Sequence, residues 1–327
     1  MKDLKRIATL FLSLLIISLI IVGISGCEKG ETEKPEVINI GYSLRPLNLP
    51  TIVAQEKEMF EAAFAEEGIE VKWHELEGPA TTEALAAKSI DYAISLNYVS
   101  AIIAKANGND LKVVSSYTRF PKGIGLLAAT DRGINSVQDL KGRKVALQKG
   151  TMLQEMLYKA LTEVNLTPSD VEIISMTSPD AVNALVLKQV DAVVLPEPLM
   201  MKTVATKKAT LLRDAEGLIL GQAFIVARKD FLEQYPEIHK KFWATHLESL
   251  EWVESNKEEA LNLAAEVNQM DLKAVKALYP KFDFSPAIDE ENISKLKETT
   301  EFLKTNNFIS KDVDTESLIN EMLDGAK

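Results

Sequence analysis

Hydrophobic and polar positions follow one another along this chain in two periods, one typical of strands and one typical of helices. Val37–Tyr42 is a short β-branched run that ends in a polar loop. Ile52, Phe60 and Phe64 then recur on one helical face down to Gly68, a natural helix terminator. The pattern therefore predicts a strand followed by one helix. The same alternation continues beyond this point and favours parallel α/β sheets joined by right-handed crossovers.

Four further strands are predicted in the following part of the chain, at Ile69–Trp73, Asp91–Leu96, Leu111–Ser116 and Gly125–Ala129. After about Phe231 the strand pattern stops and the helical period takes over. The predicted helices there are Pro236–Asn256, Glu258–Glu266, Asp271–Leu278 and Asp289–Thr305. We expect these helices to pack on one lobe and to complete it.

Two segments that lie 100 residues apart are similar to each other. Ala84–Asp91 (ALAAKSID) and Ala184–Asp191 (ALVLKQVD) share four identities in eight positions. Each is predicted to contain a helix end, a turn and an Asp that leads into an apolar strand. Two lobes of related topology would produce such a repeat, so the repeat supports a two-lobed chain.

The length and the charge restrict the class of protein. A chain of 327 residues exceeds the usual size of a single hydrophobic core, which favours two domains. Its 46% hydrophobic and 26% charged residues are typical of a globular protein. The net charge of −11, from 37 Lys and Arg against 48 Asp and Glu, would repel phosphate backbones, so we expect no nucleic-acid partner.

The first 27 residues have the pattern of a secretory signal. Lys2, Lys5 and Arg6 form a positive start, and Ile7–Val22 carries no charge. The small residues directly before Cys27 resemble the bacterial lipobox, in which the cysteine is acylated and becomes the new N-terminus. An uncleaved membrane anchor is the alternative.

Acylated Cys27 would hold the protein on the lipid bilayer, and the polar residues 28–36 would serve as a tether. We therefore expect an extracytoplasmic protein anchored to the cell membrane, on its periplasmic or cell-surface side. A single cysteine supplies neither an internal disulfide nor a thiolate metal site. We expect no metal and no cofactor.

Several motifs resemble those of a known family. Asp139–Ala146 (DLKGRKVA), followed by Lys149–Thr151 (KGT), resembles a signature of type II substrate-binding proteins of ABC importers. Ala104–Gly108 and Leu166–Val171 are similar to the branch that binds nitrate, taurine, aliphatic sulfonates and thiamine pyrimidines. The resemblance covers roughly Val37–Tyr235. Many relatives have glycine where this chain has Glu58 and Lys88.

The resemblance implies an α/β fold with two Rossmann-like lobes of type II periplasmic-binding topology and a helical C-terminal extension packed on lobe 1. The implied boundaries are 1–27 for the lipoprotein signal, 28–36 for the tether, 37–120 plus 227–327 for lobe 1, and 121–226 for lobe 2. The implied protein is a monomer that captures a small organic anion or zwitterion, of sulfonate, taurine-like or pyrimidine-like type. It would deliver this ligand to an ABC permease in the membrane.

Ligands in open α/β sheets bind at the carboxyl ends of strands, where helix N-termini favour anions. The residues predicted to bind the ligand are Ser43, Leu44, Asn48, Thr81, Asn97, Tyr98, Gly150, Thr151 and Glu197. Each has a structural alternative: a strand-to-helix turn for the first three, a helix cap for Thr81, and packing in a loop for Asn97 and Tyr98. Glu197 lies between two prolines, which suits a rigid surface turn. In the cleft it would favour a ligand with an amine or N–H donor.

Catalytic motifs are missing from the sequence. The three histidines, His74, His239 and His246, have no spacing that completes a metal site, and there is no G-x-S-x-G, H-E-x-x-H or Walker A sequence. We therefore expect no enzymatic activity. The alternatives are an enzyme like the pyrimidine-synthesising relatives of this fold and a ligand-sensing lipoprotein without an importer.

Overall fold

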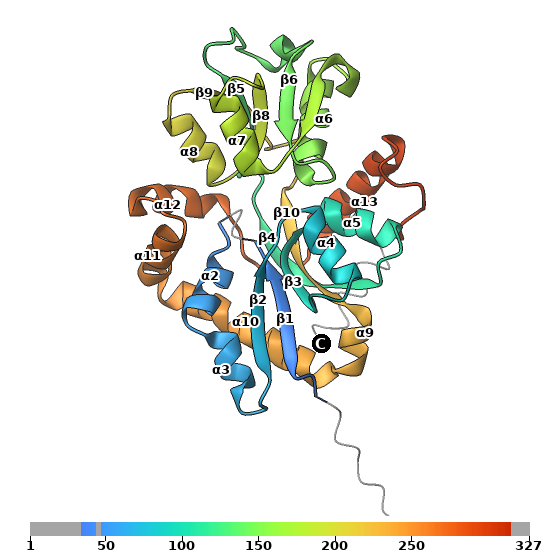
Figure 1. Ribbon diagram of the computed structural model, residues 1–327, viewed down its shortest axis with the longest axis vertical. Helices are drawn as coiled ribbons and strands as arrows, with labels where there is room; N and C mark the ends of the chain where they lie inside the picture. Colours follow the sequence, from blue (N-terminus) through green and yellow to red (C-terminus); the bar gives the residue numbers. More distant parts are fainter. Residues whose placement is uncertain (1–33, 44–46, 315–327) are drawn as a thin grey trace, which may run out of the picture. The chain divides into compact units, whose positions relative to one another are not determined.

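The computed structural model describes residues 34–43 and 47–314, and those from Glu36 onward belong to one compact unit (Figure 1). Within these residues lie two five-stranded sheets, ordered β2-β1-β3-β10-β4 and β7-β6-β8-β5-β9. The predicted two-lobed α/β architecture is confirmed. The predicted signal with Cys27, the first part of the tether and Leu44 lie outside the described residues.

The first sheet contains β1 (Val37–Tyr42), β2 (Glu70–Glu75), β3 (Tyr92–Asn97), β4 (Leu111–Arg119) and β10 (Gln222–Arg228). Its helices are α2 (Leu49–Glu56), α3 (Met59–Ala65), α4 (Pro79–Ala86) and α5 (Tyr98–Ala106). Strand β1 runs parallel to β2 and β3, whereas β10 runs antiparallel to β3 and β4. The prediction of parallel sheets is therefore wrong for β10, because this strand brings the chain back from the second lobe.

The second sheet contains β5 (Ile124–Ala129), β6 (Lys144–Leu147), β7 (Glu172–Ser175), β8 (Ala192–Pro196) and β9 (Ala209–Asp214). It is accompanied by the 3-10 helices η2 (Val137–Leu140) and η3 (Pro168–Asp170) and by α6 (Met152–Glu163), α7 (Ser178–Val186) and α8 (Leu199–Ala205). Strand β6 pairs in parallel with β7 and β8, and β5 pairs antiparallel with β8 and β9. This sheet is mixed in the same way as the first.

The chain crosses between the lobes twice, after β4 and before β10 (Figure 1). The two crossings meet where the Phe120 N–H donates to the Gly221 carbonyl at 2.8 Å. Because β10 begins at Gln222 and pairs with β3 and β4, residues 222–226 belong to the first sheet. The predicted boundary of lobe 2 at residue 226 is therefore too late.

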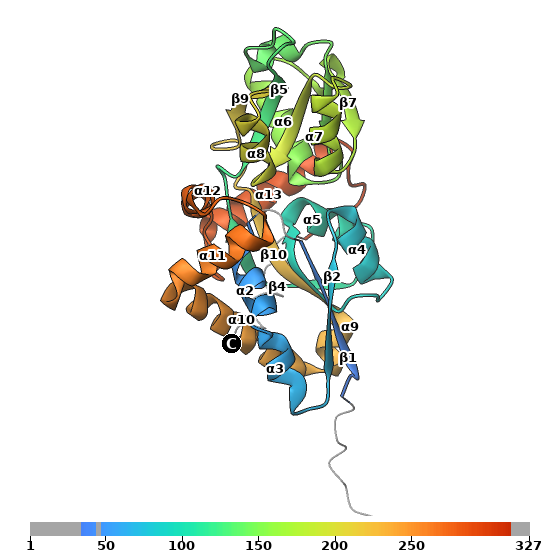
Figure 2. The same cartoon turned by 60° about the vertical axis from the view of Figure 1, so that its left-hand side comes forward.

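The C-terminal part is helical, with α9 (Lys229–Gln234), α10 (Pro236–Ser255), α11 (Lys257–Val267), α12 (Leu272–Leu278), the 3-10 helix η4 (Tyr279–Lys281) and α13 (Glu290–Thr305). Helices α10 and α11 pack on α2 of the first lobe, as expected (Figure 2). Helix α13 also contacts the second lobe, where Glu298 forms an ion pair of 2.6 Å with Lys159. Across the described residues, none of the helices has both the length and the apolar composition needed to span a membrane.

The hydrophobic core runs through both lobes. One cluster of buried side chains includes Leu96 of the first lobe and Leu147 of the second. A second cluster lies between the first sheet and α10, where the rings of Tyr92 and Phe242 stack with their centroids 3.8 Å apart. A third cluster around Val193 belongs to the second lobe. Buried side chains of both lobes thus pack together at the junction between the lobes.

The helix predicted to run down to Gly68 is two helices, α2 and α3, with a break at Glu58. Glu58 has a φ of 50°, in the left-handed region, which ends α2. Lys88 also has a left-handed φ, of 59°. These are the two positions at which many relatives carry glycine, so the backbone conformation explains the glycine there.

Replacing Glu58 with glycine is expected to raise the free energy of unfolding by about 1 kcal/mol, because glycine adopts a left-handed φ without steric cost. Urea unfolding measures the change. Glu56→Gly, within the last turn of α2, is the matched control and should lower the free energy by about 1 kcal/mol. A loss of stability in Glu58→Gly would show that the left-handed φ of Glu58 does not destabilise the parent protein.

The internal repeat marks the same structural position in the two lobes. Asp91 Oδ2 accepts the backbone N–H of Asn39 in β1 at 2.8 Å, and Asp191 Oδ2 accepts that of Lys144 in β6 at 2.9 Å. In each lobe the aspartate directly before one strand thus bonds to the backbone of the neighbouring parallel strand. The repeat therefore has a structural basis.

Candidate functional site

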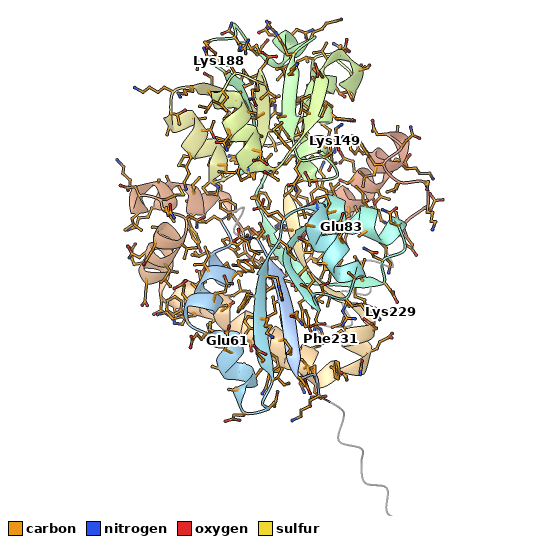
Figure 3. The ribbon with its side chains drawn as sticks, viewed as in Figure 1. Glu61, Glu83, Lys149, Lys188, Lys229 and Phe231 are labelled. Carbon is orange, nitrogen blue, oxygen red and sulfur yellow. The ribbon has the colours of Figure 1, made fainter. Side chains whose placement is uncertain are left out.

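A small cavity, called here the interlobe pocket, lies at the junction of the two lobes. Its volume is about 60 Å³, room for a few water molecules or a small polar head group. Its lining consists of Ser43, Leu76, Glu77, Gly78, Thr81, Ile94, Ser95, Leu96 and Asn97 from the first lobe and Gln148, Thr151, Met152, Leu153, Ser178 and Pro196 from the second. Figure 3 labels Glu83 on α4 and Lys149 just before α6, one on each side of the junction.

Four helices begin at the interlobe pocket, two from each lobe. Asn97 caps α5 and Thr151 caps α6, and each side-chain oxygen accepts an N–H from the first turn of its helix. Thr81 belongs to the first turn of α4, and Ser178 is the first residue of α7. The positive dipole ends of these helices therefore converge on the pocket.

Hydroxyl and amide groups dominate the polar lining of the pocket. Thr81, Thr151 and Ser178 are only 5%, 4% and 3% exposed. Among the residues that the structure describes, the lining contains no lysine or arginine. The charged side chain among the described lining residues is that of Glu77, a carboxylate.

Four of the residues predicted from the sequence line the pocket, namely Ser43, Thr81, Asn97 and Thr151. Asn97 and Thr151 combine this position with a capping role. Thr81 is not a cap, since α4 begins earlier, with Gly78 as its N-cap. Its side chain is therefore not required to cap α4.

Asn48 lies behind the pocket lining rather than in it. Its side-chain N–H donates to the Ser43 carbonyl, and its Oδ1 accepts the Ser95 hydroxyl at 3.2 Å. Both of these partners line the pocket, so Asn48 positions two lining residues.

Tyr98 and Gly150 are also outside the lining, and their polar groups bond to the protein. The buried Tyr98 hydroxyl donates to Glu155 at 2.6 Å, and the Gly150 N–H donates to Gln154 at 2.9 Å. Burial and the nearby Glu155 carboxylate raise the pKa of Tyr98 well above its usual value. Tyr98 therefore remains a neutral donor over the physiological pH range.

Glu197 is neither an exposed turn residue nor part of the pocket lining. It is 1% exposed, and its carboxylate accepts from Lys281 Nζ at 2.8 Å and from the Met201 N–H at 2.9 Å. Both carboxylate oxygens thus have partners within the protein. The expectation of a surface turn is wrong, and we do not propose Glu197 as a ligand contact.

A sequence profile of NMT1/THI5-like proteins matches residues 46–260. The chain belongs to this family. It is similar to the candidate aliphatic sulfonates-binding proteins of Bacillus subtilis (strain 168) and Escherichia coli (strain K12). The first is 29% identical over 94% of this chain and 93% of that protein, and the second is 27% identical over 86% and 87%. The predicted resemblance is confirmed.

Solved structures confirm the type II periplasmic-binding fold for this NMT1/THI5-like protein. The alkanesulfonate-binding protein SsuA from Xanthomonas axonopodis pv. citri matches with a TM-score of 0.79 and 22% identity over 88% of this chain and 98% of that one. The aliphatic sulphonate binding protein SsuA from Escherichia coli matches with a TM-score of 0.71 and 25% identity over 86% and 91%. The nitrate-binding protein NrtA from Synechocystis PCC 6803 has a TM-score of 0.69 and 15% identity over 90% and 89%.

The residues predicted from the sequence do not include four polar lining residues of this NMT1/THI5-like protein, Glu77, Ser95, Gln148 and Ser178. The Thr177-Ser178-Pro179 sequence, a cap followed by a proline, indicates the start of α7 and could have identified Ser178. Gln148 comes close to Gly78 of the other lobe, so that a Cβ on Gly78 would lie 2.4 Å from Gln148 Nε2. Sequence alone gives no signal for that approach.

Proposed function

We propose that the chain is the extracytoplasmic solute-binding component of an ABC importer and that it captures a small organic anion in the interlobe pocket. The observation that carries the proposal is the convergence of four helix starts, from two lobes, on one cavity with hydroxyl and amide donors. The names of the relatives from Bacillus subtilis and Escherichia coli support an aliphatic sulfonate as the ligand class.

A sulfonate suits the lining of the pocket. Its negative charge is spread over three oxygens, each of which accepts hydrogen bonds from neutral groups such as the Ser178 hydroxyl and the Thr151 hydroxyl, which would turn to it from the Gln148 carbonyl. A short apolar tail has Leu76, Met152 and Pro196 as neighbours in the lining. A zwitterion of taurine-like type and a pyrimidine-like ligand are the other classes to test.

A ligand in this position contacts both lobes, so binding favours the arrangement in which the lobes touch. The permease would recognise that arrangement and accept the ligand from it. Acylation of Cys27 would keep the protein, as a monomer, on the outer side of the membrane that contains the permease. Residues 28–36 would give it the reach to dock.

A thermal-shift screen of the unit Glu36–Lys327 tests the proposal. The compounds are alkanesulfonates, taurine, nitrate, aminopyrimidines, riboflavin and amino acids. A ligand at 100 times its Kd adds about 2.7 kcal/mol of stability, which gives a clear rise in Tm. We expect the largest rise with an alkanesulfonate, and uptake of that compound by cells that contain the full chain and its permease. No rise with any compound would contradict the proposal.

Thr151→Val is expected to raise the Kd of the captured anion at least tenfold, because the variant lacks the buried hydroxyl that donates to the Gln148 carbonyl at 2.7 Å and that would turn to the anion on binding. Calorimetric titration measures the Kd. Thr177→Val is the matched control, because Thr177 caps α7 as Thr151 caps α6 but does not line the pocket. Both variants should lose about 1 kcal/mol of stability, and only Thr151→Val should lose affinity. Equal Kd values in the two variants would exclude Thr151 as a ligand contact.

A further inference from the structure

Two carboxylates of the second lobe are almost completely buried, and partners from outside that lobe hold both of them. Glu155 lies in the first turn of α6, and Glu197 follows β8. Each residue is 1% exposed. A carboxylate removed from water needs hydrogen-bond donors or a positive charge, so the source of its partners is informative.

The partners of Glu155 come largely from the other side of the junction. Its Oε2 accepts the hydroxyl of Tyr98, the first residue of α5, at 2.6 Å, and its Oε1 accepts the hydroxyl of Thr299 in α13 at 2.8 Å. Lys159, one turn further along α6, lies 3.0 Å from Oε1. Lys159 is therefore the only one of these three partners that belongs to the same lobe.

Glu197 has the same division of partners. Its Oε2 accepts the Met201 N–H from its own lobe at 2.9 Å, whereas its Oε1 accepts from Lys281 in η4 at 2.8 Å. The Lys281 side chain is 29% exposed and the Glu197 side chain 1%. Lys281 thus provides the positive charge for a carboxylate that lies inside the other lobe.

Both carboxylates lie directly behind walls of the interlobe pocket. The start of α6, which includes Thr151 and Met152, lines the pocket one turn before Glu155. Pro196, the neighbour of Glu197, lines it as well. The cross-lobe bonds therefore hold two walls of the pocket against the first lobe and the C-terminal helices.

We propose that Glu155 and Glu197 form an interlobe clasp that stabilises the touching arrangement of the lobes and thereby sets the affinity of the pocket. Separation of the lobes removes Tyr98 and Thr299 from Glu155, and Lys281 from Glu197. Water then has to replace these partners. The part of this proposal that concerns affinity rests on the proposed function, whereas the effect on lobe closure does not.

Two single substitutions remove cross-lobe partners, and each has a matched control inside one lobe. Tyr98→Phe removes the donor to Glu155, and Tyr117→Phe removes an equally buried hydroxyl that bonds to Thr51 at 2.7 Å within the first lobe. Lys281→Met removes the partner of Glu197. Lys241→Met removes a lysine that pairs with Glu67 at 2.6 Å, also outside the second lobe.

The readout is the distance between two spin labels, at Glu66→Cys in the first lobe and Gln138→Cys in the second, in the unit Glu36–Lys327. Both positions are exposed. The chain's single cysteine, Cys27, lies outside this unit, so no other thiol is labelled. Double electron–electron resonance, measured without any ligand, then reports lobe closure independently of the proposed function.

Tyr98→Phe and Lys281→Met should each shift the distance distribution away from that of the parent protein, and the two control variants should not. With a ligand from the screen, we expect the Kd to rise about fivefold in each cross-lobe variant, the effect of one lost hydrogen bond. Unchanged ligand-free distances in both cross-lobe variants would overturn the clasp. If no ligand is found but the distances shift, the clasp stands and the proposed function fails.

Discussion

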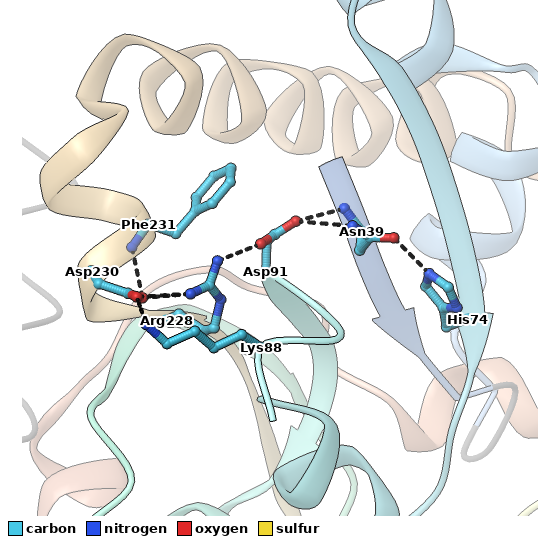
Figure 4. Close-up of polar contacts among 7 residues, drawn as sticks. All are labelled: Asn39, His74, Lys88, Asp91, Arg228, Asp230 and Phe231. Carbon is cyan, nitrogen blue, oxygen red and sulfur yellow. Dashed lines mark hydrogen bonds and ion pairs between the residues drawn. The ribbon is translucent and has the colours of Figure 1, made fainter. Parts of the chain in front are cut away.

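Replacing Asp91 with alanine is expected to lower the free energy of unfolding by about 3 kcal/mol, since the change breaks a buried ion pair from one side. Asp91 is 5% exposed. Its Oδ1 accepts from Arg228 at 2.7 Å, and its Oδ2 accepts the Asn39 N–H at 2.8 Å (Figure 4). The alanine would leave the Arg228 guanidinium, 14% exposed, with Asp230 as its remaining carboxylate partner. That remaining pair keeps the loss at the lower end of the range for buried ion pairs.

Urea unfolding of the unit Glu36–Lys327 measures this loss, and the second lobe offers a matched control. Asp191 occupies the equivalent position, but its distance to Arg132 is 3.5 Å and its side chain is 14% exposed, against 7% for Asp91. Asp191→Ala should therefore cost less, about 1 to 2 kcal/mol. An equal loss of stability in the two variants would show that the deeper burial of Asp91 and its short contact with Arg228 do not increase its contribution.

The protein is expected to lose stability as the pH falls from 6.5 to 4, and His246 should contribute about 3 kcal/mol of that loss. His246 is 2% exposed, and burial lowers its pKa from 6.5 to about 4. Its ring lies near those of Tyr117 and Trp243, with centroids 5.8 and 5.6 Å away. Between these pH values the unfolded chain binds a proton at His246 and the folded chain does not, so acid favours unfolding.

Urea midpoints at pH 7 and pH 4.5 measure the effect, and His246→Gln should flatten the difference between them. Burial also lowers the pKa of His239 to about 4. His239 still titrates in the variant, so part of the difference between the two midpoints should remain. The ion pairs with Lys88 and Arg228 lower the pKa of Asp230, so its contribution is lost mainly below this window. Glu298, whose pKa is lowered from 4.5 by its pairs with Lys159 and Lys295, begins to lose its contribution at the acid end of the window. An unchanged slope in His246→Gln would show that His246 does not carry the pH dependence.

Local sequence signals predicted the elements well where neighbours along the chain determine them. Val37–Tyr42 was predicted as a strand with the bounds that the structure gives, and the helix at Pro236 ends one residue earlier than predicted. The helix across Glu58 was wrongly predicted as continuous, because a charged residue gives no local sign of a left-handed φ. The antiparallel direction of β10 depends on the path of the whole chain between the lobes.

In the candidate site, too, local sequence predicts some features, and contacts between distant parts of the chain determine the others. Thr151 and Asn97 could be predicted, because a capping residue at or shortly after the end of a strand places its helix start at the edge of the sheet. The partners of Tyr98 and Glu197 could not be predicted, because Glu155 and Lys281 lie 57 and 84 residues away in the sequence. Tertiary pairing of this kind decides whether a polar side chain faces the ligand or stabilises the protein.

We propose that the interlobe pocket binds an anion through donors of both lobes. The most direct measurement is a crystal structure of the unit Glu36–Lys327 grown with ethanesulfonate. We expect one sulfonate group in the interlobe pocket, with its oxygens within hydrogen-bond distance of Thr151 or Ser178 from the second lobe and of Thr81 or Asn97 from the first. A sulfonate bound outside this pocket, with the pocket filled by water, would contradict it.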